Sequence, residues 1–196
     1  MTLIDADLLE VWKGMEIAAE SGKAKAVGVS NFSSEQCERI MKNAKVPISA
    51  NQVELHAYFQ QTKLRDALDK LDIKVMAYAP LGSRTLISKV AEEPFQLALE
   101  NSTVAEIAKG HGKTPAQVLL RHLVQLGIIV VPMSTNPSRI QQNHDIFDFT
   151  LTKEEIAKMN DLDKGSAGRT FGFDFFPTIN KYSTMKEYPF IERDRY

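Results

Sequence analysis

The chain has 196 residues, of which 43% are hydrophobic and 25% are charged, a composition that predicts one ordered globular domain with a sizeable core. A formal net charge of −1 excludes the strongly basic surface used to bind nucleic acid or acidic membranes. No apolar run approaches the roughly 20 residues of a membrane span, and the residues after Met1 lack the layout of a signal peptide. The single cysteine, Cys37, excludes an internal disulfide, so we expect a cytoplasmic protein.

Helical and strand-like patterns alternate from the start of the chain. Residues 6–21 predict a helix whose apolar stripe consists of Leu8, Trp12, Met15 and Ala19. Residues 25–30 predict a short buried strand. Ser33 and Gln36 form a capping-box pattern that opens the next helix, and residues 48–54 predict the second strand.

The same unit recurs further along the chain. Thr62 is predicted to cap a helix, and further helix starts are predicted at Thr114-Pro115-Ala-Gln117, at Asn136-Pro137 and at Thr152 to Glu155. Further strands are predicted over residues 73–79 and 128–132. Residues 84–100 form an excursion after the third strand. Strands separated by single helices predict parallel pairing with right-handed crossovers, and therefore an α/β fold.

Polar residues gather where the predicted strands end. The blocks are Val29-Ser-Asn-Phe32, Asn51-Gln-Val-Glu-Leu-His56, Tyr78-Ala-Pro-Leu-Gly-Ser83 and Val131-Pro-Met-Ser-Thr-Asn136. A (β/α)8 barrel builds its site from the carboxyl ends of successive parallel strands. The pattern is therefore typical of a functional site at one end of the sheet.

In order and spacing these blocks resemble the aldo-keto reductase family. Trp12-Lys-Gly-Met-Glu16 and Tyr188-Pro-Phe190 extend the resemblance over nearly the whole chain. The resemblance implies a (β/α)8 TIM-barrel type fold and NADP(H)-dependent reduction of a small-molecule aldehyde or ketone to an alcohol. Residues 1–196 would be one oxidoreductase domain, in which the aromatic-rich residues 165–196 form a tail over the barrel end. That tail either packs across the barrel or also lines the substrate pocket.

The resemblance also implies which residues bind the cofactor. Ser30, Asn31 and Gln52 match the positions that hydrogen-bond the nicotinamide carboxamide, and Tyr78 matches the aromatic residue that stacks on the nicotinamide ring. Ala79, Pro80, Leu81 and Ser83 match the loop over the pyrophosphate, and Pro132, Met133, Ser134, Asn136, Arg139, Gln142 and Asn143 match the adenosine end with its 2′-phosphate. Singly, Tyr78 would more often be a core residue, Asn31 and Asn51 turn or cap residues, and Arg139 a solvated charge. Their order along the chain is what favours the functional interpretation.

Met133 departs from the family pattern, because a lysine that reaches the 2′-phosphate usually stands there. A thioether cannot replace that charge-assisted contact, so we expect weaker NADP(H) binding and a possible use of NAD(H).

A second departure is an absence. The family's catalytic tyrosine, lysine, aspartate and histidine lie on the first four strands, whereas this chain matches only from the helix before the fifth. No catalytic residue is therefore assigned, the chain alone is expected to be inactive, and its four histidines match no motif. Residue spacing typical of a metal site is also lacking, so no metal is expected.

Four parallel strands cannot close a barrel, and they would leave two strand edges and an apolar inner face open. The chain is then a fragment of a longer enzyme, or it pairs with another half, or it is marginally folded, and in isolation we expect it to self-associate. The leading function is the cofactor-binding part of a carbonyl reductase. The alternatives are a catalytically inactive truncated paralogue that binds a nucleotide or a partner protein, and a truncated reading frame without a stable product.

Overall fold

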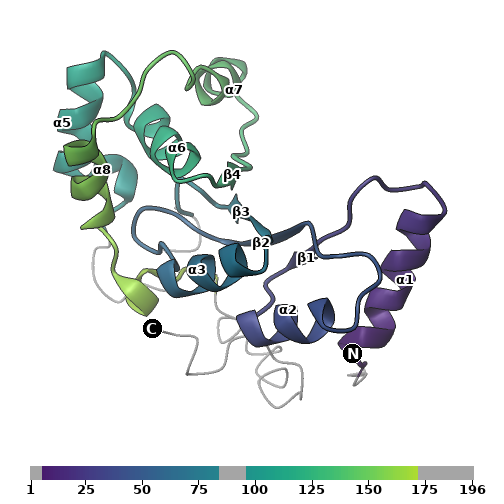
Figure 1. Cartoon of the computed structure of the whole chain (residues 1–196). Helices are drawn as coiled ribbons and strands as arrows, with labels where there is room; N and C mark the ends of the chain where they lie inside the picture. Colours follow the sequence, from purple (N-terminus) through teal and green to yellow (C-terminus); the bar gives the residue numbers. More distant parts are fainter. Residues whose placement is uncertain (1–5, 84–95, 172–196) are drawn as a thin grey trace, which may run out of the picture. The chain divides into compact units, whose positions relative to one another are not determined.

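The computed structural model describes residues 6–83 and 96–171 (Figure 1). In chain order their elements are α1 Leu8–Glu20, β1 Val29–Ser30, α2 Ser34–Met41, β2 Ala50–Glu54, α3 Thr62–Lys70, β3 Lys74–Tyr78, the 3₁₀ turn η1 Ala98–Glu100, α5 Ser102–His111, α6 Pro115–Gln125, β4 Ile129–Val130, α7 Pro137–His144, α8 Lys153–Asn160 and the 3₁₀ turn η2 Gly165–Gly168. The predicted alternation of single helices and strands is confirmed as far as β3, whereas both α5 and α6 lie between β3 and β4. Most of the predicted excursion over residues 84–100 and of the tail over residues 165–196 lies outside the described residues.

The strands form a sheet in the order β1-β2-β3-β4. β1 pairs with β2 in parallel from Val29 opposite Asn51, and β3 pairs with β4 in parallel from Met76 opposite Ile129. The parallel α/β fold class is therefore confirmed. β1 and β4 have two residues each and are shorter than predicted. Each stands at an end of the strand order, so within the described ranges it has a pairing neighbour on one side only.

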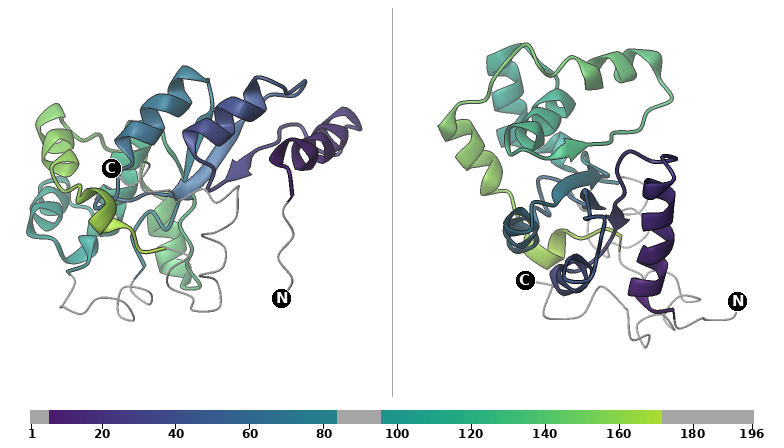
Figure 2. Two further views of the ribbon diagram at one scale, coloured as in Figure 1. Left: turned by 90° about the horizontal axis from the view of Figure 1, so that it is seen from below. Right: turned by 45° about the vertical axis from the view of Figure 1, so that its right-hand side comes forward.

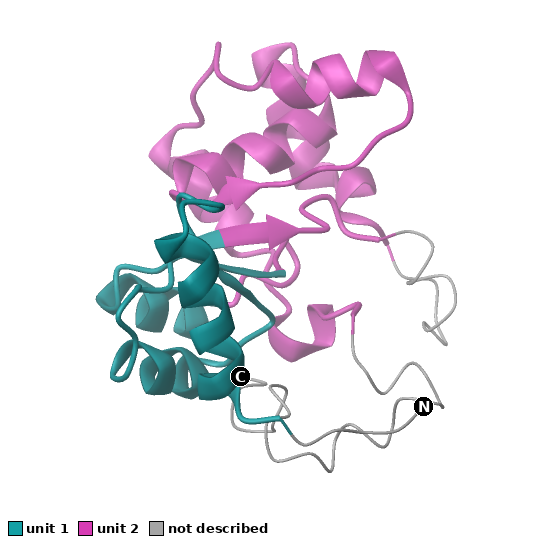
Figure 3. Cartoon of the chain, turned by 90° about the vertical axis from the view of Figure 1, so that its right-hand side faces the viewer, with its two compact units in different colours: residues 1–53, 62–75, 172–196 teal, residues 54–61, 76–171 magenta. Residues whose placement is uncertain are grey.

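The described residues fall into two compact units, coloured teal and magenta in Figure 3. Unit 1 contains residues 6–53 and 62–75, and unit 2 contains residues 54–61, 76–83 and 96–171. The chain passes from unit 1 into unit 2 at Glu54, the last residue of β2.

In unit 1, α2 and α3 lie side by side, as the views of Figures 1 and 2 agree. The predicted capping box of α2 is present: Ser33 Oγ accepts a hydrogen bond from the N–H of Gln36, whose side chain accepts one from the N–H of Ser33. Two predictions need correction. Glu16, rather than Met15 of the expected apolar stripe, turns inward on α1, because its carboxylate accepts hydrogen bonds from the N–H groups of residues 45 and 46. Thr62 is the first residue of α3 and not its cap.

In unit 2, the predicted starts of α6, α7 and α8 are all confirmed with their caps. The core of this unit is formed by Ala57, Tyr58, Ala98, Val104, Ile107, Ala108, Val118, Leu119, Leu151 and Met159. The start of α5 was not predicted from the sequence. It follows Asn101, whose side chain accepts hydrogen bonds from the N–H groups of Thr103 and Val104 and so acts as an N-cap.

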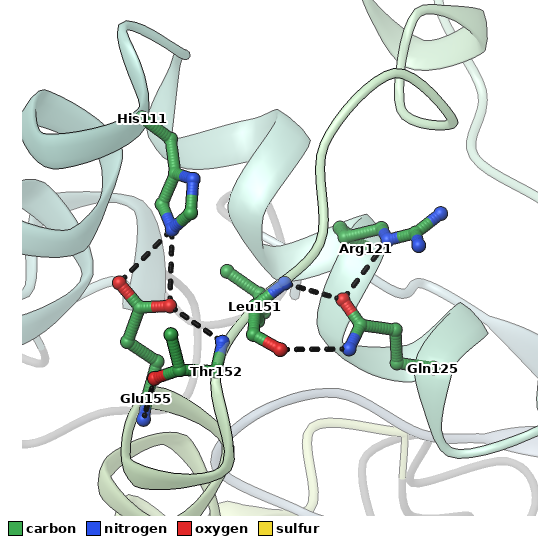
Figure 4. Close-up of polar contacts among 6 residues, drawn as sticks. All are labelled: His111, Arg121, Gln125, Leu151, Thr152 and Glu155. Carbon is green, nitrogen blue, oxygen red and sulfur yellow. Dashed lines mark hydrogen bonds and ion pairs between the residues drawn. The ribbon is translucent and has the colours of Figure 1, made fainter.

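In unit 2 the side-chain amide of Gln125 pairs with both backbone groups of Leu151, as a neighbouring strand would (Figure 4). Gln125 Oε1 accepts a hydrogen bond from Leu151 N at 2.7 Å, and Gln125 Nε2 donates one to Leu151 O at 3.0 Å. Arg121 Nε fixes the amide by donating to the same Oε1 at 2.9 Å. In the same view, His111 Nε2 lies 2.9 and 3.0 Å from the two carboxylate oxygens of Glu155. Gln125 thus fastens the chain before α8 to α6, and the contact of His111 with Glu155 joins α5 to α8.

Within residues 6–83 and 96–171, no helix combines the length and the apolar character that crossing a bilayer requires.

Candidate functional site

Three of the predicted cofactor-binding residues lie together in unit 1, where the end of β1 pairs with the middle of β2. Asn31 has a φ of 58°, in the left-handed region that asparagine tolerates better than most residues. Its N–H donates to Gln52 O at 2.8 Å, and Ser30 Oγ donates to the same oxygen at 3.0 Å. The turn after β1 therefore places Ser30 and Asn31 beside Gln52.

A buried asparagine holds this turn in shape. Asn51 is fully buried, and its Nδ2 donates to Phe32 O at 2.8 Å while its Oδ1 accepts from Phe32 N at 3.4 Å. Asn51 therefore has the turn-forming role that its residue type suggested, and it positions the residues next to it.

The side chain of Asn31 fits the proposed ligand. Among the described residues it makes no hydrogen bond, so its donor and acceptor groups are both available. A carboxamide presents one acceptor oxygen and one donor NH₂, which an amide side chain can match in both directions. Removal of that side chain is the natural test of the site.

The predicted pyrophosphate loop follows β3 in unit 2. Ala79 also has a left-handed φ, 49°, and Gly82 N donates to Ala79 O at 2.8 Å, so the residues after Tyr78 form a tight turn. Pro80 is buried, Leu81 packs against the core of unit 2, and Ser83 is half-buried. Because Gly82 N–H is used inside the turn, it is not among the anion donors expected of this loop.

The predicted adenosine end is an exposed segment of unit 2 that runs from Pro132 through α7. Ser134 Oγ accepts from Asn136 N at 3.2 Å, and Asn136 Oδ1 caps α7 by accepting from Arg139 N at 3.2 Å. None of the residues of α7 is buried, and Gln142 and Asn143 are half-buried. The capped helix start presents its positive end to solvent, which suits a phosphate.

Met133 is 92% exposed, although it is a large apolar residue. A side chain with so little contact does not serve the core. It stands on the surface of the segment that the sequence assigns to the 2′-phosphate.

Two of the four histidines end helices, and the other two are buried. His111 and His144 end α5 and α7 as expected, and His56 and His122 are buried. No group of His, Cys, Asp and Glu suited to a metal ion occurs in the described part of the chain. A surface hollow of about 430 Å³ in unit 2 is lined by Gly112, Lys113, Gln117, His144, Asp145, Phe147 and Asp148. None of the predicted cofactor-binding residues lines this hollow.

Sequence reasoning missed a buried carboxylate at the end of β2. Glu54 is 1% exposed, and Thr170 N donates to its Oε1 at 2.7 Å and Phe171 N to its Oε2 at 2.9 Å. The Thr170 hydroxyl also donates to Oε1, and His56 Nε2 lies 3.2 Å from it. Burial works to raise the pKa of Glu54, but the hydrogen bonds from His56 and Thr170 outweigh it and hold the pKa below its usual value. The sequence feature that could have indicated this buried carboxylate is its place between two apolar residues, 53 and 55, whose side chains are both buried.

Comparisons with known proteins identify the family to which the chain belongs. The sequence pattern of the Aldo/keto reductase family matches residues 4–164. The chain is 39% identical to the 9,11-endoperoxide prostaglandin H2 reductase of Trypanosoma cruzi, over 86% of this chain and 56% of that protein. It is 41% identical to the aldo-keto reductase family 1 member A1 of Mus musculus, over 79% of this chain and 47% of that protein.

A solved structure, the Bombyx mori aldo-keto reductase in complex with NADP, superposes with a TM-score of 0.83 at 34% identity, covering 96% of this chain and 58% of that one. The chain spans about half the length of the curated relatives it matches. On the strength of the matched family pattern and of these relatives, the chain belongs to the aldo-keto reductase family.

Proposed function

We propose that this chain is the cofactor-binding part of an NADP(H)-dependent aldo-keto reductase, which reduces aldehyde or ketone carbonyls to alcohols. In this proposal it corresponds to strands 5–8 of an incomplete (β/α)8 barrel, as one domain with residues 165–196 as a tail, in a cytoplasmic protein. The observation that carries the proposal is the turn after β1, which sets Ser30 and Asn31 beside Gln52 with the amide of Asn31 available.

Each group of residues has its own part in holding the cofactor. Ser30, Asn31 and Gln52 would hydrogen-bond the carboxamide and so choose which face of the nicotinamide ring presents its hydride. Tyr78 would cover the other face of the ring and exclude water from it. When bound, NADPH supplies the hydride, while the residues that deliver a proton to the carbonyl oxygen are expected elsewhere in the enzyme.

The adenosine end would be held by Ser134, Asn136, Arg139 and the start of α7. Arg139 is exposed and has no ion-pair partner in the described part of the chain, so its guanidinium can reach a phosphate or stack on adenine. Because Met133 supplies no charge, we propose a weaker preference for NADP(H) over NAD(H) than is usual in the family.

The proposal is tested by removing the amide of Asn31 without straining the backbone. Glycine accepts a φ of 58°, so Asn31→Gly deletes only the side chain. Asp72→Gly is the matched control, because Asp72 has a φ of 54° in the same unit and its side chain is 90% exposed. Loss of about one hydrogen bond should weaken NADPH binding roughly five- to tenfold in Asn31→Gly, whereas Asp72→Gly should bind as the parent chain does.

The parent chain decides between the proposal and its alternatives. Saturable NADPH binding that weakens only in Asn31→Gly supports the assignment, and an absence of NADPH binding by the parent chain contradicts it. Aldehyde-dependent NADPH oxidation by the full-length gene product separates an enzyme from a nucleotide-binding paralogue. Sedimentation of the purified chain tests the expected self-association, which a monodisperse monomer would contradict.

A further inference from the structure

The Glu54 carboxylate in unit 2 makes more hydrogen bonds than a merely tolerated charge needs. Its two oxygens accept from two successive backbone N–H groups, those of Thr170 and Phe171, and from the Thr170 hydroxyl. A buried charge is costly unless it is well hydrogen-bonded, and here the bonds are charge-assisted, which makes them about twice as strong as neutral ones. Glu54 therefore fixes the main chain at residues 170–171 rather than only a side chain.

The segment that leads to Thr170 also lies close against the loop after Glu54. A Cβ added at Gly168 would lie 1.8 Å from Tyr58 O, so only glycine fits there. Lys164 N donates to Tyr58 O at 2.9 Å, and the Arg169 guanidinium carbon lies 4.5 Å from the centre of the Phe59 ring. These contacts orient the chain so that it reaches Glu54 in one direction.

Beyond Thr170 the next side chain meets Tyr78. The rings of Tyr78 and Phe171 have centroids 5.3 Å apart and an interplanar angle of 87°, an edge-to-face contact. The main chain of Tyr78 is held from the same region, because Leu55 N donates to Tyr78 O at 3.3 Å. Leu55 thus bonds the main chain of Tyr78, while Phe171 contacts its ring.

We propose that Glu54 is a positioning residue for the nicotinamide end of the cofactor: it anchors Thr170 and Phe171, and Phe171 holds the Tyr78 ring in place. The inference rests on the proposed function, in which Tyr78 covers the nicotinamide. If Glu54 positions only the nicotinamide end, its substitution should weaken binding at that end and leave binding at the adenosine end unchanged. General destabilisation of the fold would weaken binding at both ends.

Three substitutions interrupt the chain of contacts at successive points. Glu54→Gln keeps the size of the side chain but replaces one acceptor oxygen with a donor. Thr170→Val is isosteric and removes only the hydroxyl donor, so it is the variant least expected to unfold the protein. Phe171→Leu keeps an apolar side chain and removes the ring edge. Asp163→Asn is the matched control: it also turns a carboxylate into an amide in this region, where Asp163 Oδ1 accepts from Gln60 N and Gly165 N, each at 3.1 Å.

Two ligands report on the two ends of the cofactor. NADPH contains both ends, whereas adenosine 2′,5′-bisphosphate contains only the end assigned to α7. Calorimetric titration gives both dissociation constants, and the fluorescence emission of bound NADPH reports directly on the surroundings of its nicotinamide ring. The unfolding midpoint of each variant is measured in parallel.

The expected result is a loss of about three- to tenfold in NADPH affinity for Glu54→Gln, Thr170→Val and Phe171→Leu, the scale of one aromatic contact. Emission of bound NADPH should shift in all three, adenosine 2′,5′-bisphosphate should bind as to the parent chain, and Asp163→Asn should change neither ligand. Equal losses for both ligands, or equal effects of Asp163→Asn, would reduce Glu54 to a structural role and overturn the inference. If the three variants bind NADPH as tightly as the parent chain does, this inference is overturned while the proposed function stands. A parent chain that does not bind NADPH overturns the proposed function, and this inference with it.

Discussion

Met133→Lys would restore the charge that this chain lacks beside the proposed 2′-phosphate position. Met133 is 92% exposed, so an unbranched side chain of similar length can replace it without disturbing the core. NADH lacks the 2′-phosphate and serves as the internal reference. The substitution should therefore strengthen NADPH binding and leave NADH binding unchanged.

The size of the gain depends on how far solvent screens the new contact. A sheltered charge-assisted hydrogen bond contributes about 1.5–3 kcal/mol, whereas an exposed ion pair contributes about 0–1 kcal/mol. Because the side chain at residue 133 is 92% exposed, the upper values do not apply. We expect about 1 kcal/mol, which corresponds to roughly fivefold tighter NADPH binding.

Titration of NADPH and NADH into the parent chain, Met133→Lys and Met133→Gln measures this gain. Met133→Gln is the neutral control of comparable length, and the gain of Met133→Lys should shrink as salt is added, because exposed charges are screened. An equal gain for NADH, or a gain that salt does not reduce, would refute the electrostatic reasoning. A parent chain that already binds NADPH at micromolar affinity and NADH at least about a hundredfold more weakly would contradict its premise.

Three further predictions concern the described fold. Burial, assisted by the charge of a neighbouring glutamate, raises the pKa of Cys37 to about 12. Its thiol should therefore react with Ellman's reagent only as fast as the chain unfolds, and fast labelling of the native chain would contradict this. Gly168→Ala should destabilise the chain by several kcal/mol in urea unfolding because its Cβ meets a main-chain oxygen, whereas Gly110→Ala, with open space in α5, should stabilise it by about 0.5–1 kcal/mol; similar midpoints for the two variants would refute this. Burial works to raise the pKa of Glu155, but its hydrogen bonds with His111 and Thr152 outweigh burial, so its pKa is lower in the folded chain than in the unfolded chain. The charged Glu155 therefore stabilises the fold fully above about pH 5, and this contribution is lost as the pH falls below that value. Glu155→Gln should therefore flatten the acid limb of stability against pH, and an unchanged limb would contradict the assignment.

Local chemistry explains why much of the fold could be predicted from the sequence. The capping boxes of α2, α6 and α8 each join residues three apart, so sequence spacing alone determines them. The turn after β1 was predictable for a related reason, because a Ser-Asn pair ending a strand carries its own conformational preference. The positions proposed for the cofactor were likewise visible as polar residues at strand ends.

Long-range chemistry explains what the sequence did not reveal. The inward turn of Glu16 depends on backbone donors at residues 45 and 46, which no helical periodicity includes. The lengths of β1 and β4 depend on which neighbours pair with them. The backbone N–H groups that donate to Glu54 lie 116 and 117 residues further along the chain, so its anchoring role could not be read from the neighbouring sequence.

That separation in sequence also sets an order of events during synthesis. Glu54 leaves the ribosome 116 residues before Thr170, an interval of roughly 6–23 seconds at the usual rate of translation. Throughout this time the carboxylate lacks the N–H groups of Thr170 and Phe171, which bond it in the folded chain. A nascent chain that stops before residue 170 therefore leaves the Glu54 carboxylate without its backbone donors and Tyr78 without its contact from Phe171.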